Sequence, residues 1–247
     1  MLLSGKNAIV TGANRGIGRS IVEQFAQNGA NIWAHARRET PEFLADMAAI
    51  AGRCGVEIEP ICFDLTDRLS MKTCAKQIAS STRPVDALVN NAGVAHGGLF
   101  QMTSIETIRE IFEINLFSTL ELSQLIVRLM QRRRCGSIIN IASLAGLELK
   151  SGNVAYGVSK AALIAATKTM AAELGGLGIR VNAIAPGLTD TDMAALMEPQ
   201  ARRNMIDGSS MGRMARPKEI ADVAVFLASD MASFMTGQVL CVDGGAI

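Results

Sequence analysis

The sequence of 247 residues has almost no net charge and no long apolar stretch. Its 24 basic and 23 acidic residues give a net charge of +1, so no strong field directs the chain to nucleic acid or to a bilayer surface. No apolar run reaches the roughly 18 residues that suggest a membrane-spanning helix. The first strand is expected almost at the N-terminus, which leaves no room for a signal peptide. We therefore expect neither a nucleic-acid partner nor a membrane.

Cysteine and histidine are also scarce. The cysteines are odd in number and show no Cys-x-x-Cys spacing, which is typical of reduced thiols in a cytoplasmic protein. They are Cys54, Cys62, Cys74, Cys135 and Cys241. The two histidines, His35 and His96, lack the spacing of metal ligands. The sequence therefore predicts a cytoplasmic protein without a metal site, in which each histidine is a packed or surface residue.

The chain does contain an ample supply of apolar residues, 49% of the total. Strand patterns alternate with helical patterns at least six times, and no linker, repeat or low-complexity segment interrupts them. This order predicts a single α/β domain over residues 1–247, of the doubly wound type, with a mainly parallel sheet and helices on both faces. The expected strands cover residues 7–11, 30–35, 57–63, 85–89, 137–142, 179–185 and 238–242.

A glycine-rich segment follows the first expected strand and opens an amphipathic helix. It reads Gly12-Ala13-Asn14-Arg15-Gly16-Ile17-Gly18. Glycines let the backbone come close to a pyrophosphate, and the N-terminus of the helix supplies amide donors and a favourable dipole. A tight turn that needs glycine for its backbone angles is the structural alternative. The position beside the first strand favours phosphate binding at the opening of a dinucleotide-binding unit.

The end of the second expected strand carries arginine where NAD enzymes place a carboxylate. The chain reads Ala36-Arg37-Arg38 at this point. A guanidinium can grip a 2′-phosphate with two hydrogen bonds, whereas a carboxylate would repel it. Arg37, together with Arg15 from the glycine turn, would form a basic cup. We therefore predict NADP(H) rather than NAD(H) as the cofactor.

Polar residues follow the third and fourth expected strands. Asp64-Leu65 comes after the third, where a carboxylate and the neighbouring backbone could meet an adenine edge. Asp64 could equally cap the helix that begins near Asp67. Asn90-Asn91-Ala92-Gly93 follows the fourth strand, at the edge of the sheet where ligands bind in open α/β folds. We expect its amides both to tie neighbouring strands together and to line the cofactor cleft.

Asn115 lies inside a helical apolar pattern that runs on to about Arg134. An asparagine in the middle of a helix competes with the backbone for hydrogen bonds and is usually unfavourable there. Its presence suggests a specific role, such as kinking the helix or holding a water molecule.

A short constellation of Ser143, Tyr156 and Lys160 indicates chemistry. Tyr156 and Lys160 are four residues apart, which puts both side chains on one face of a helix. A neighbouring ammonium favours the phenolate, so we expect the pKa of Tyr156 to lie below the ordinary value of ~10. Reduction of a carbonyl needs such a proton donor, because the oxygen becomes an alkoxide as hydride arrives at carbon. Ser143, at the end of the fifth strand, could place its hydroxyl on the same oxygen.

Residues 189–214 hold five methionines, Met193, Met197, Met205, Met211 and Met214. Flexible segments rich in methionine adapt to apolar ligands, although methionine more often fills a core. We interpret this segment as a mobile lid over the substrate.

These motifs together resemble those of the short-chain dehydrogenase/reductase family, and the resemblance covers essentially the whole chain. It implies a Rossmann-type fold and a nicotinamide cofactor. The matching residues are Thr11-Gly12-x-x-x-Gly16-x-Gly18, Asn90-Asn91-Ala92-Gly93, Asn115, Ser143, Tyr156-x-x-x-Lys160, Pro186-Gly187 and Val242-Asp243-Gly244-Gly245.

The resemblance also implies a role for each candidate catalytic residue. Tyr156 would act as general acid and Ser143 would bind the carbonyl oxygen. Lys160 would hold the ribose and lower the pKa of the tyrosine, and Asn115 would position a water in the proton relay. Thr191 would lie near the nicotinamide carboxamide. The predicted cofactor-binding residues are Gly12, Asn14, Arg15, Gly16, Ile17, Gly18, Arg37, Asp64, Leu65, Asn91, Ala92, Gly93, Tyr156, Lys160, Pro186, Gly187, Thr189 and Thr191.

Within the family, the chain is most similar to the 3-oxoacyl-[acyl-carrier-protein] reductases of bacterial fatty acid biosynthesis. This similarity implies NADPH-dependent reduction of a 3-oxoacyl thioester, an acyl carrier protein as partner and a homotetramer that pairs the helices holding Asn115 and Tyr156. Arg134 sits where a basic residue could meet an acidic carrier. Leu177 stands where such reductases often carry a second basic residue, and Glu148 and Lys150 put charge into the substrate loop.

Two alternatives remain open at this stage. The chain could act on another alcohol/ketone pair, such as a sugar derivative, a steroid or a small secondary alcohol. It could also be a non-catalytic nucleotide-binding protein, since a fold does not fix a function.

Overall fold

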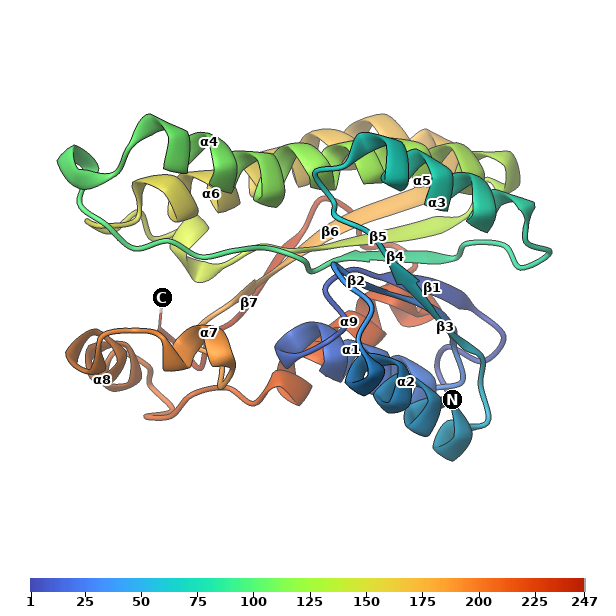
Figure 1. Ribbon diagram of the computed structural model, residues 1–247, viewed down its shortest axis with the longest axis horizontal. Helices are drawn as coiled ribbons and strands as arrows, with labels where there is room; N and C mark the ends of the chain where they lie inside the picture. The colour runs from blue at the N-terminus through green and yellow to red at the C-terminus, as the bar shows by residue number, and fades with distance from the viewer. Residues whose placement is uncertain (247) are drawn as a thin grey trace.

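The computed structural model describes residues 1–246 and places seven strands in one sheet (Figure 1). Every pairing between neighbouring strands is parallel. The strand order is β3-β2-β1-β4-β5-β6-β7, so the chain winds one way from β1 to β3 and the other way from β4 to β7. The strands are β1 (Asn7–Val10), β2 (Asn31–Ala36), β3 (Ile58–Cys62), β4 (Ala87–Asn90), β5 (Gly136–Ile141), β6 (Ile179–Pro186) and β7 (Val239–Val242).

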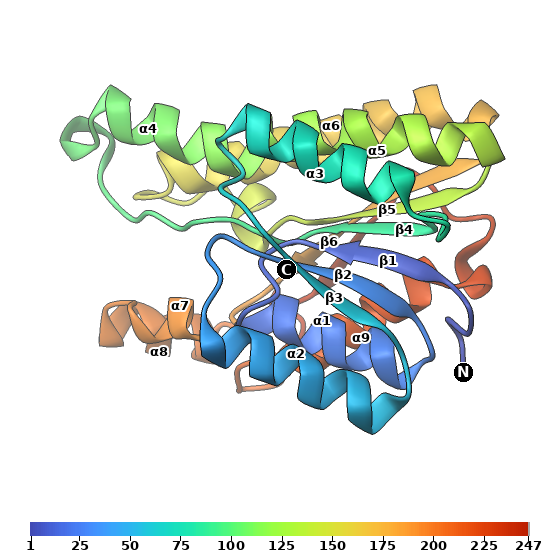
Figure 2. The ribbon, with the colours of Figure 1, turned by 45° about the vertical axis from the view of Figure 1, so that its right-hand side comes forward.

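Helices cover both faces of the sheet (Figures 1 and 2). One face carries α1 (Gly16–Gln27), α2 (Pro41–Cys54) and α9 (Pro217–Ala228). The other carries α3 (Arg68–Ser80), α4 (Ile105–Phe112), α5 (Ser118–Arg133) and α6 (Val154–Leu174). Two short helices, α7 (Asp192–Ala195) and α8 (Pro199–Asp207), come between β6 and α9 in the chain. They lie to one side of the sheet. The predicted doubly wound α/β fold is therefore confirmed.

The core is split between the two faces of the sheet. Successive side chains of a strand point to opposite faces, and β1 follows this rule. Val10 packs with Phe25 of α1 on one side. Ile9 packs with Trp33 and with Ile126 of α5 on the other. The central strands are buried on both sides, which holds their carboxyl ends in fixed positions for the loops that follow.

Residues typical of helix ends bound two of the helices. Thr40 accepts a hydrogen bond from the Phe43 amide at 3.2 Å and caps α2. The two glycines after Leu174 end α6. The interpretation of Asp64 as the cap of α3 is wrong, because Asp67 directly precedes that helix and accepts from its first amides.

Within residues 1–246, no helix combines the length and the apolar character needed to cross a bilayer. The same residues contain no group of three or more histidine, cysteine, aspartate or glutamate side chains gathered as metal ligands would be.

Candidate active site

The glycine turn lies where the strand order reverses, between β1 and β4. Gly12 has a φ of 67°, which favours glycine, and a Cβ on it would lie 3.0 Å from the Ala92 Cα after β4. A Cβ on Gly18 would overlap with the carbonyl oxygen of Gly12 and the side-chain amide of Asn91. Only glycine fits at these two positions, so the turn packs directly against the segment that follows β4.

Hydrogen bonds fix the turn to that segment. The Asn91 side-chain amide donates to the carbonyl oxygens of Thr11 at 2.9 Å and Gly12 at 3.2 Å. The Thr11 hydroxyl accepts from the backbone amides of Asn91 at 2.9 Å and Ala92 at 3.0 Å. The prediction that these amides tie neighbouring strands is confirmed.

The N-terminus of α1 has free donors. Arg15 occupies the N-cap position without a side-chain capping bond, and the first turn contains no acidic residue. The first amides of a helix lack partners within the helix and favour an anion. Together with the close-packed glycines, this arrangement fits the pyrophosphate of a dinucleotide. Asn14 is exposed at the turn, whereas Ile17 packs against the core.

The two arginines of the predicted basic cup are each held by a carboxylate. Arg37, after β2, donates to Asp64 at 2.8 Å, and Arg15 pairs with Asp192 of α7 at 3.3 Å. Hydrogen bonds from the Thr66 backbone amide and hydroxyl, with smaller help from Arg37, lower the pKa of Asp64. Leu65, which follows Asp64, is buried in the core on the α3 and α5 face.

Asn115 sits in a π-helical turn, Glu113–Phe117, that separates α4 from α5. It is fully buried. Its side-chain oxygen accepts from the Val94 amide, and its side-chain nitrogen donates to the Val94 carbonyl, both at 2.9 Å. The same nitrogen donates to the Ser159 hydroxyl at 3.1 Å. The predicted irregularity of the helix is therefore present, and both amide hydrogens are used within the protein.

Lys160 of α6 links the catalytic candidates to the segment after β4. Its buried ammonium donates to the Ile141 carbonyl at 2.8 Å and lies 5.9 Å from the centre of the Tyr156 ring. A Cβ added to Gly93 would lie 3.1 Å from Asn115 Oδ1 and 3.4 Å from Lys160 Nζ. The segment after β4 thus contacts both the glycine turn and the catalytic candidates.

The pKa of Tyr156 differs from the expectation. Burial raises the pKa of its phenol above the ordinary value, and a hydrogen bond with Ser143 opposes that rise. Burial also lowers the pKa of Lys160 to about 8. The predicted lowering of the tyrosine pKa by Lys160 is wrong for this structure, because desolvation dominates and the ammonium is bonded to a backbone carbonyl. The same hydrogen bond places the Ser143 and Tyr156 hydroxyls side by side.

The residues after β6 close the other side of the glycine turn. A Cβ on Gly16 would lie 3.2 Å from Thr191 Cγ2. Thr189 is buried, and its hydroxyl donates to the Gly187 carbonyl at 3.1 Å. Pro186 pairs with Val242 of β7. The segments predicted to bind the cofactor thus lie at or after the carboxyl ends of strands β1 to β6.

The far end of the methionine-rich segment is fastened to the C-terminal residues. The Met211 amide donates to the Gly244 carbonyl at 3.0 Å, and the Ser209 hydroxyl donates to the same carbonyl at 3.0 Å. Met193, Met205 and Met211 are exposed. These methionines are therefore not core filler.

Two buried residues near the site were not predicted. Ser159 accepts from Asn115 and donates to the Tyr156 carbonyl at 2.7 Å. His35, at the carboxyl end of β2, accepts from the Gly12 amide through Nδ1 at 3.4 Å. A polar residue next to Lys160, and a histidine ending a buried strand, were the sequence signals that could have revealed them.

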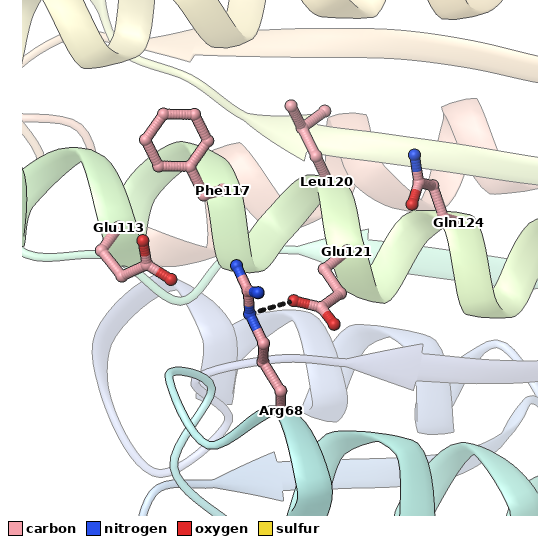
Figure 3. A pocket seen from close by; sticks show the side chains of 6 residues that line it. All are labelled: Arg68, Glu113, Phe117, Leu120, Glu121 and Gln124. Atoms are coloured by element: carbon pink, nitrogen blue, oxygen red, sulfur yellow. Dashed lines mark ion pairs between the residues drawn. The ribbon is translucent and has the colours of Figure 1, made fainter.

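Two features lie away from this edge. Arg134 caps the end of α5 just before β5, at the amino end of the sheet, and donates to the Gly176 carbonyl at 2.7 Å. Figure 3 shows a surface hollow between α3 and α5 in which Arg68 pairs with Glu121 at 3.1 Å beside Phe117. Neither feature contacts the Ser143, Tyr156 and Lys160 cluster.

Known proteins resemble this chain over nearly its whole length. The family described as "Enoyl-(Acyl carrier protein) reductase" matches residues 12–246. The chain is 35% identical over 249 residues to the 3-oxoacyl-[acyl-carrier-protein] reductase FabG of Thermotoga maritima, covering all of both chains. It is 37% identical to the Escherichia coli protein of the same name, covering 99% of this chain and 98% of that one.

Solved structures add two neighbours. A putative NAD(P)-dependent gluconate 5-dehydrogenase from Beutenbergia cavernae, with bound NADP at low occupancy, is 37% identical, with a TM-score of 0.92 over 99% of this chain and 97% of the other. A putative gluconate dehydrogenase from Agrobacterium tumefaciens is 29% identical, with a TM-score of 0.94 over 99% and 96%. The chain therefore belongs to the short-chain dehydrogenase/reductase family of oxidoreductases.

Proposed function

We propose that this protein is an NADPH-dependent carbonyl reductase. The observation that carries the proposal is the continuous set of contacts from the glycine turn through Gly93 to Lys160, beside the Ser143 and Tyr156 pair. A nucleotide site and a proton donor then share one edge of the sheet, as a hydride transfer to a carbonyl requires.

The cofactor would be held by the glycine turn, the α1 amides and the residues after β4 and β6. Arg37 and Arg15 favour NADP(H), because each guanidinium can exchange its carboxylate partner for a 2′-phosphate. The NADP bound to the Beutenbergia neighbour supports this choice. When bound, NADPH supplies the hydride for the carbonyl carbon.

The protein's own groups would handle the charge on the substrate oxygen. Ser143 and Tyr156 donate hydrogen bonds to it, and Tyr156 then releases its proton to it. The raised pKa of Tyr156 keeps the phenol protonated at neutral pH, as a general acid must be before transfer. Lys160 would hold the cofactor ribose. Asn115 would position a water that returns the proton through its backbone, because its side chain is already bonded to Val94 and Ser159.

A 3-oxoacyl thioester is the substrate class that we favour. Two loops that follow the carboxyl ends of β5 and β6 expose apolar side chains: Leu149 before α6 is 66% exposed and Leu196 after α7 is 88% exposed. An acyl chain would cover such surface, and the methionine-rich residues 189–214 would act as its lid. The carrier-protein reductases among the relatives support the same class. An acyl carrier protein would be the partner that delivers this substrate. Arg134 lies at the amino end of the sheet, away from Ser143 and Tyr156, so within one protomer it does not support that contact.

A sugar acid is the second candidate substrate. The two structural neighbours are putative gluconate dehydrogenases. In addition, Glu148 and Lys150 form an ion pair at 2.7 Å in the loop before α6, which places polar groups next to the apolar ones. Oxidation of a polyhydroxy acid with NADP⁺ would use the same Ser143 and Tyr156 in the reverse direction.

The absorbance of the cofactor at neutral pH distinguishes these candidate functions. Fast oxidation of NADPH with acetoacetyl thioester is expected. Reduction of NADP⁺ with gluconate, and no rate with the thioester, would favour the sugar acid instead. No rate with any ketone or alcohol, despite tight NADP⁺ binding, would indicate a non-catalytic nucleotide-binding protein. With whichever substrate and cofactor react, Tyr156→Phe should lower kcat by roughly 10²–10⁴-fold without loss of NADPH binding.

We also propose a homotetramer and a cytoplasmic location. The outer face formed by α4, α5 and α6 would pair with a second copy, and Phe117 on it is 50% exposed beside Phe112. The free cysteines suit a reducing compartment.

A further inference from the structure

His35 lies directly beneath the glycine turn, between the carboxyl ends of β1 and β3. It is 2% exposed and is the next-to-last residue of β2. Its Nε2 bonds to the Phe63 carbonyl at 2.9 Å, and its Nδ1 faces the Gly12 amide at 3.4 Å. Its backbone carbonyl accepts from the Ala13 amide at 2.7 Å. His35 therefore holds the first two amides of the turn, one with its side chain and one with its backbone.

Only one form of the imidazole satisfies these partners. A carbonyl oxygen needs a donor, so Nε2 carries the hydrogen and Nδ1 is left as the acceptor for the Gly12 amide. In the doubly protonated form both ring nitrogens are donors. Nδ1–H would then face the Gly12 N–H, and the turn would have to move away from the ring.

The turn has little freedom to move without losing its shape. Gly12 is packed against Ala92, and Asn91 bonds to both Thr11 and Gly12. A displaced Gly12 would change the position of the amides that follow it at the start of α1. These are the donors that our proposed function assigns to the pyrophosphate.

We propose that neutral His35 is a positioning residue of the glycine turn, and that its protonation in mild acid weakens dinucleotide binding. The inference rests on the proposed nucleotide site and does not depend on the substrate. Burial of the ring lowers the pKa of His35, although the Phe63 carbonyl and Asp64 oppose this effect.

Charged groups around the ring could give the opposite pH dependence of cofactor binding. Asp64 after β3 favours the protonated ring, but its carboxylate is bound by Arg37 from the end of β2. Arg15 of the turn pairs with Asp192. Cys62 of β3 is a neutral thiol, because burial raises its pKa. A bound pyrophosphate would attract an imidazolium, so acid would strengthen binding if charge outweighed the hydrogen-bond pattern.

Calorimetric titration with NAD⁺ and NADP⁺ at pH 7.5 and pH 5.0 decides between these effects. Both cofactors are needed because the 2′-phosphate of NADP⁺ itself titrates near pH ~6. We expect the Kd of wild-type protein for NAD⁺ to rise about threefold or more in acid, by linkage between proton and cofactor binding. His35→Asn keeps an acceptor for the Gly12 amide without a titrating proton, and its Kd for NAD⁺ should stay constant. His96→Asn removes the other histidine and should behave like wild type.

The outcomes separate this inference from the proposed function. Binding at pH 7.5 that is unchanged or tighter at pH 5.0 overturns the role of His35 alone. An equal loss of NAD⁺ affinity at pH 5.0 in wild type and His35→Asn also overturns the role of His35 alone. No binding of either cofactor at pH 7.5 overturns the nucleotide site and the inference with it. If His35→Asn fails to fold, wild-type protein labelled with ¹⁵N-glycine gives the answer: the Gly12 amide should titrate with His35, at a lower pH once NAD⁺ is bound. A Gly12 amide chemical shift that does not change as His35 titrates overturns the proposal.

Discussion

Lys160 places an amine in the interior, where an ammonium is costly. Its single hydrogen bond to the Ile141 carbonyl does not replace water, and burial lowers its pKa to about 8. At neutral pH the amine is still mostly protonated. The cost of burying that charge is therefore present in the folded protein at the pH where it would work.

This burial predicts a pH dependence of stability. The folded-state pKa of Lys160 lies below the unfolded value of ~10.4, so the folded state releases its proton first as pH rises. Loss of the proton removes the cost of burying the charge and so stabilises the folded state. This stabilisation is complete above the unfolded pKa and is lost as pH falls through about 8. Between pH 7.5 and 9.5, wild type should gain on the order of 1 kcal/mol relative to Lys160→Met. Urea unfolding of both proteins measures this; parallel profiles would contradict it.

Among the elements, the π-helical turn at Asn115 has the clearest physical basis. The turn places a polar side chain inside the protein, where it bonds to both backbone groups of Val94 and to Ser159. It thereby joins the segment after β4 to α6. The interruption between α4 and α5 is thus a bracket between the segment after β4 and the helix that carries Tyr156 and Lys160.

Removing this bracket should destabilise the folded protein. Asn115→Leu keeps the approximate volume but leaves the two Val94 groups without their partners, so the free energy of unfolding should fall by about 2–3 kcal/mol. Gln131→Leu, an exposed change on α5, should stay within about 0.5 kcal/mol. Denaturant unfolding compares them. A similar small effect of both changes would show that the bracket is not structural.

The glycines allow a second comparison between matched changes. Gly18→Ala would drive a methyl group into the Gly12 carbonyl, so NADP⁺ binding should be lost and stability should fall. Gly52→Ala in α2 meets open space at ordinary helical angles and should raise stability by about 0.5–1 kcal/mol. Thermal unfolding with and without NADP⁺ separates the two. Retained binding in Gly18→Ala would contradict the close packing of the turn.

Much of this element-level picture could be predicted from the sequence. Alternating apolar runs and glycine positions were enough to predict the parallel sheet. The direction of the Tyr156 pKa could not be predicted, since spacing indicates a neighbour but not desolvation. The hydrogen bond from Gly12 to His35 was equally hidden, because it joins residues 23 apart, one in the turn after β1 and the other on β2.

At the scale of the whole molecule, one sheet edge carries all the site segments while the outer helices leave apolar surface. Phe117 and Phe112 lie on the face where the proposed subunits meet, with their ring centres 6.5 Å apart. The hollow beside Phe117 includes Leu120 and the Arg68–Glu121 pair (Figure 3). Such a mixed surface suits a contact with a second copy of the chain.

Phe117→Glu tests that contact. A carboxylate at the centre of the proposed interface would be buried without a partner, so the tetramer should dissociate into smaller species. Light scattering coupled to size exclusion gives the mass. Leu69→Glu changes another exposed apolar residue, on α3, and should leave the tetramer intact. A monomeric wild type, or a tetrameric Phe117→Glu, would rule out this assembly.

The clasp between Met211 and Gly244 has a practical consequence for handling the protein. Gly244 and Gly245 accept hydrogen bonds from Ser209, Ser210 and Met211, so these two glycines brace the far end of the methionine-rich segment. A purification tag appended after them would pull on that brace, whereas a tag ahead of β1 would hang from the opposite margin of the sheet. Kinetic work on this enzyme should therefore start from an amino-terminal fusion.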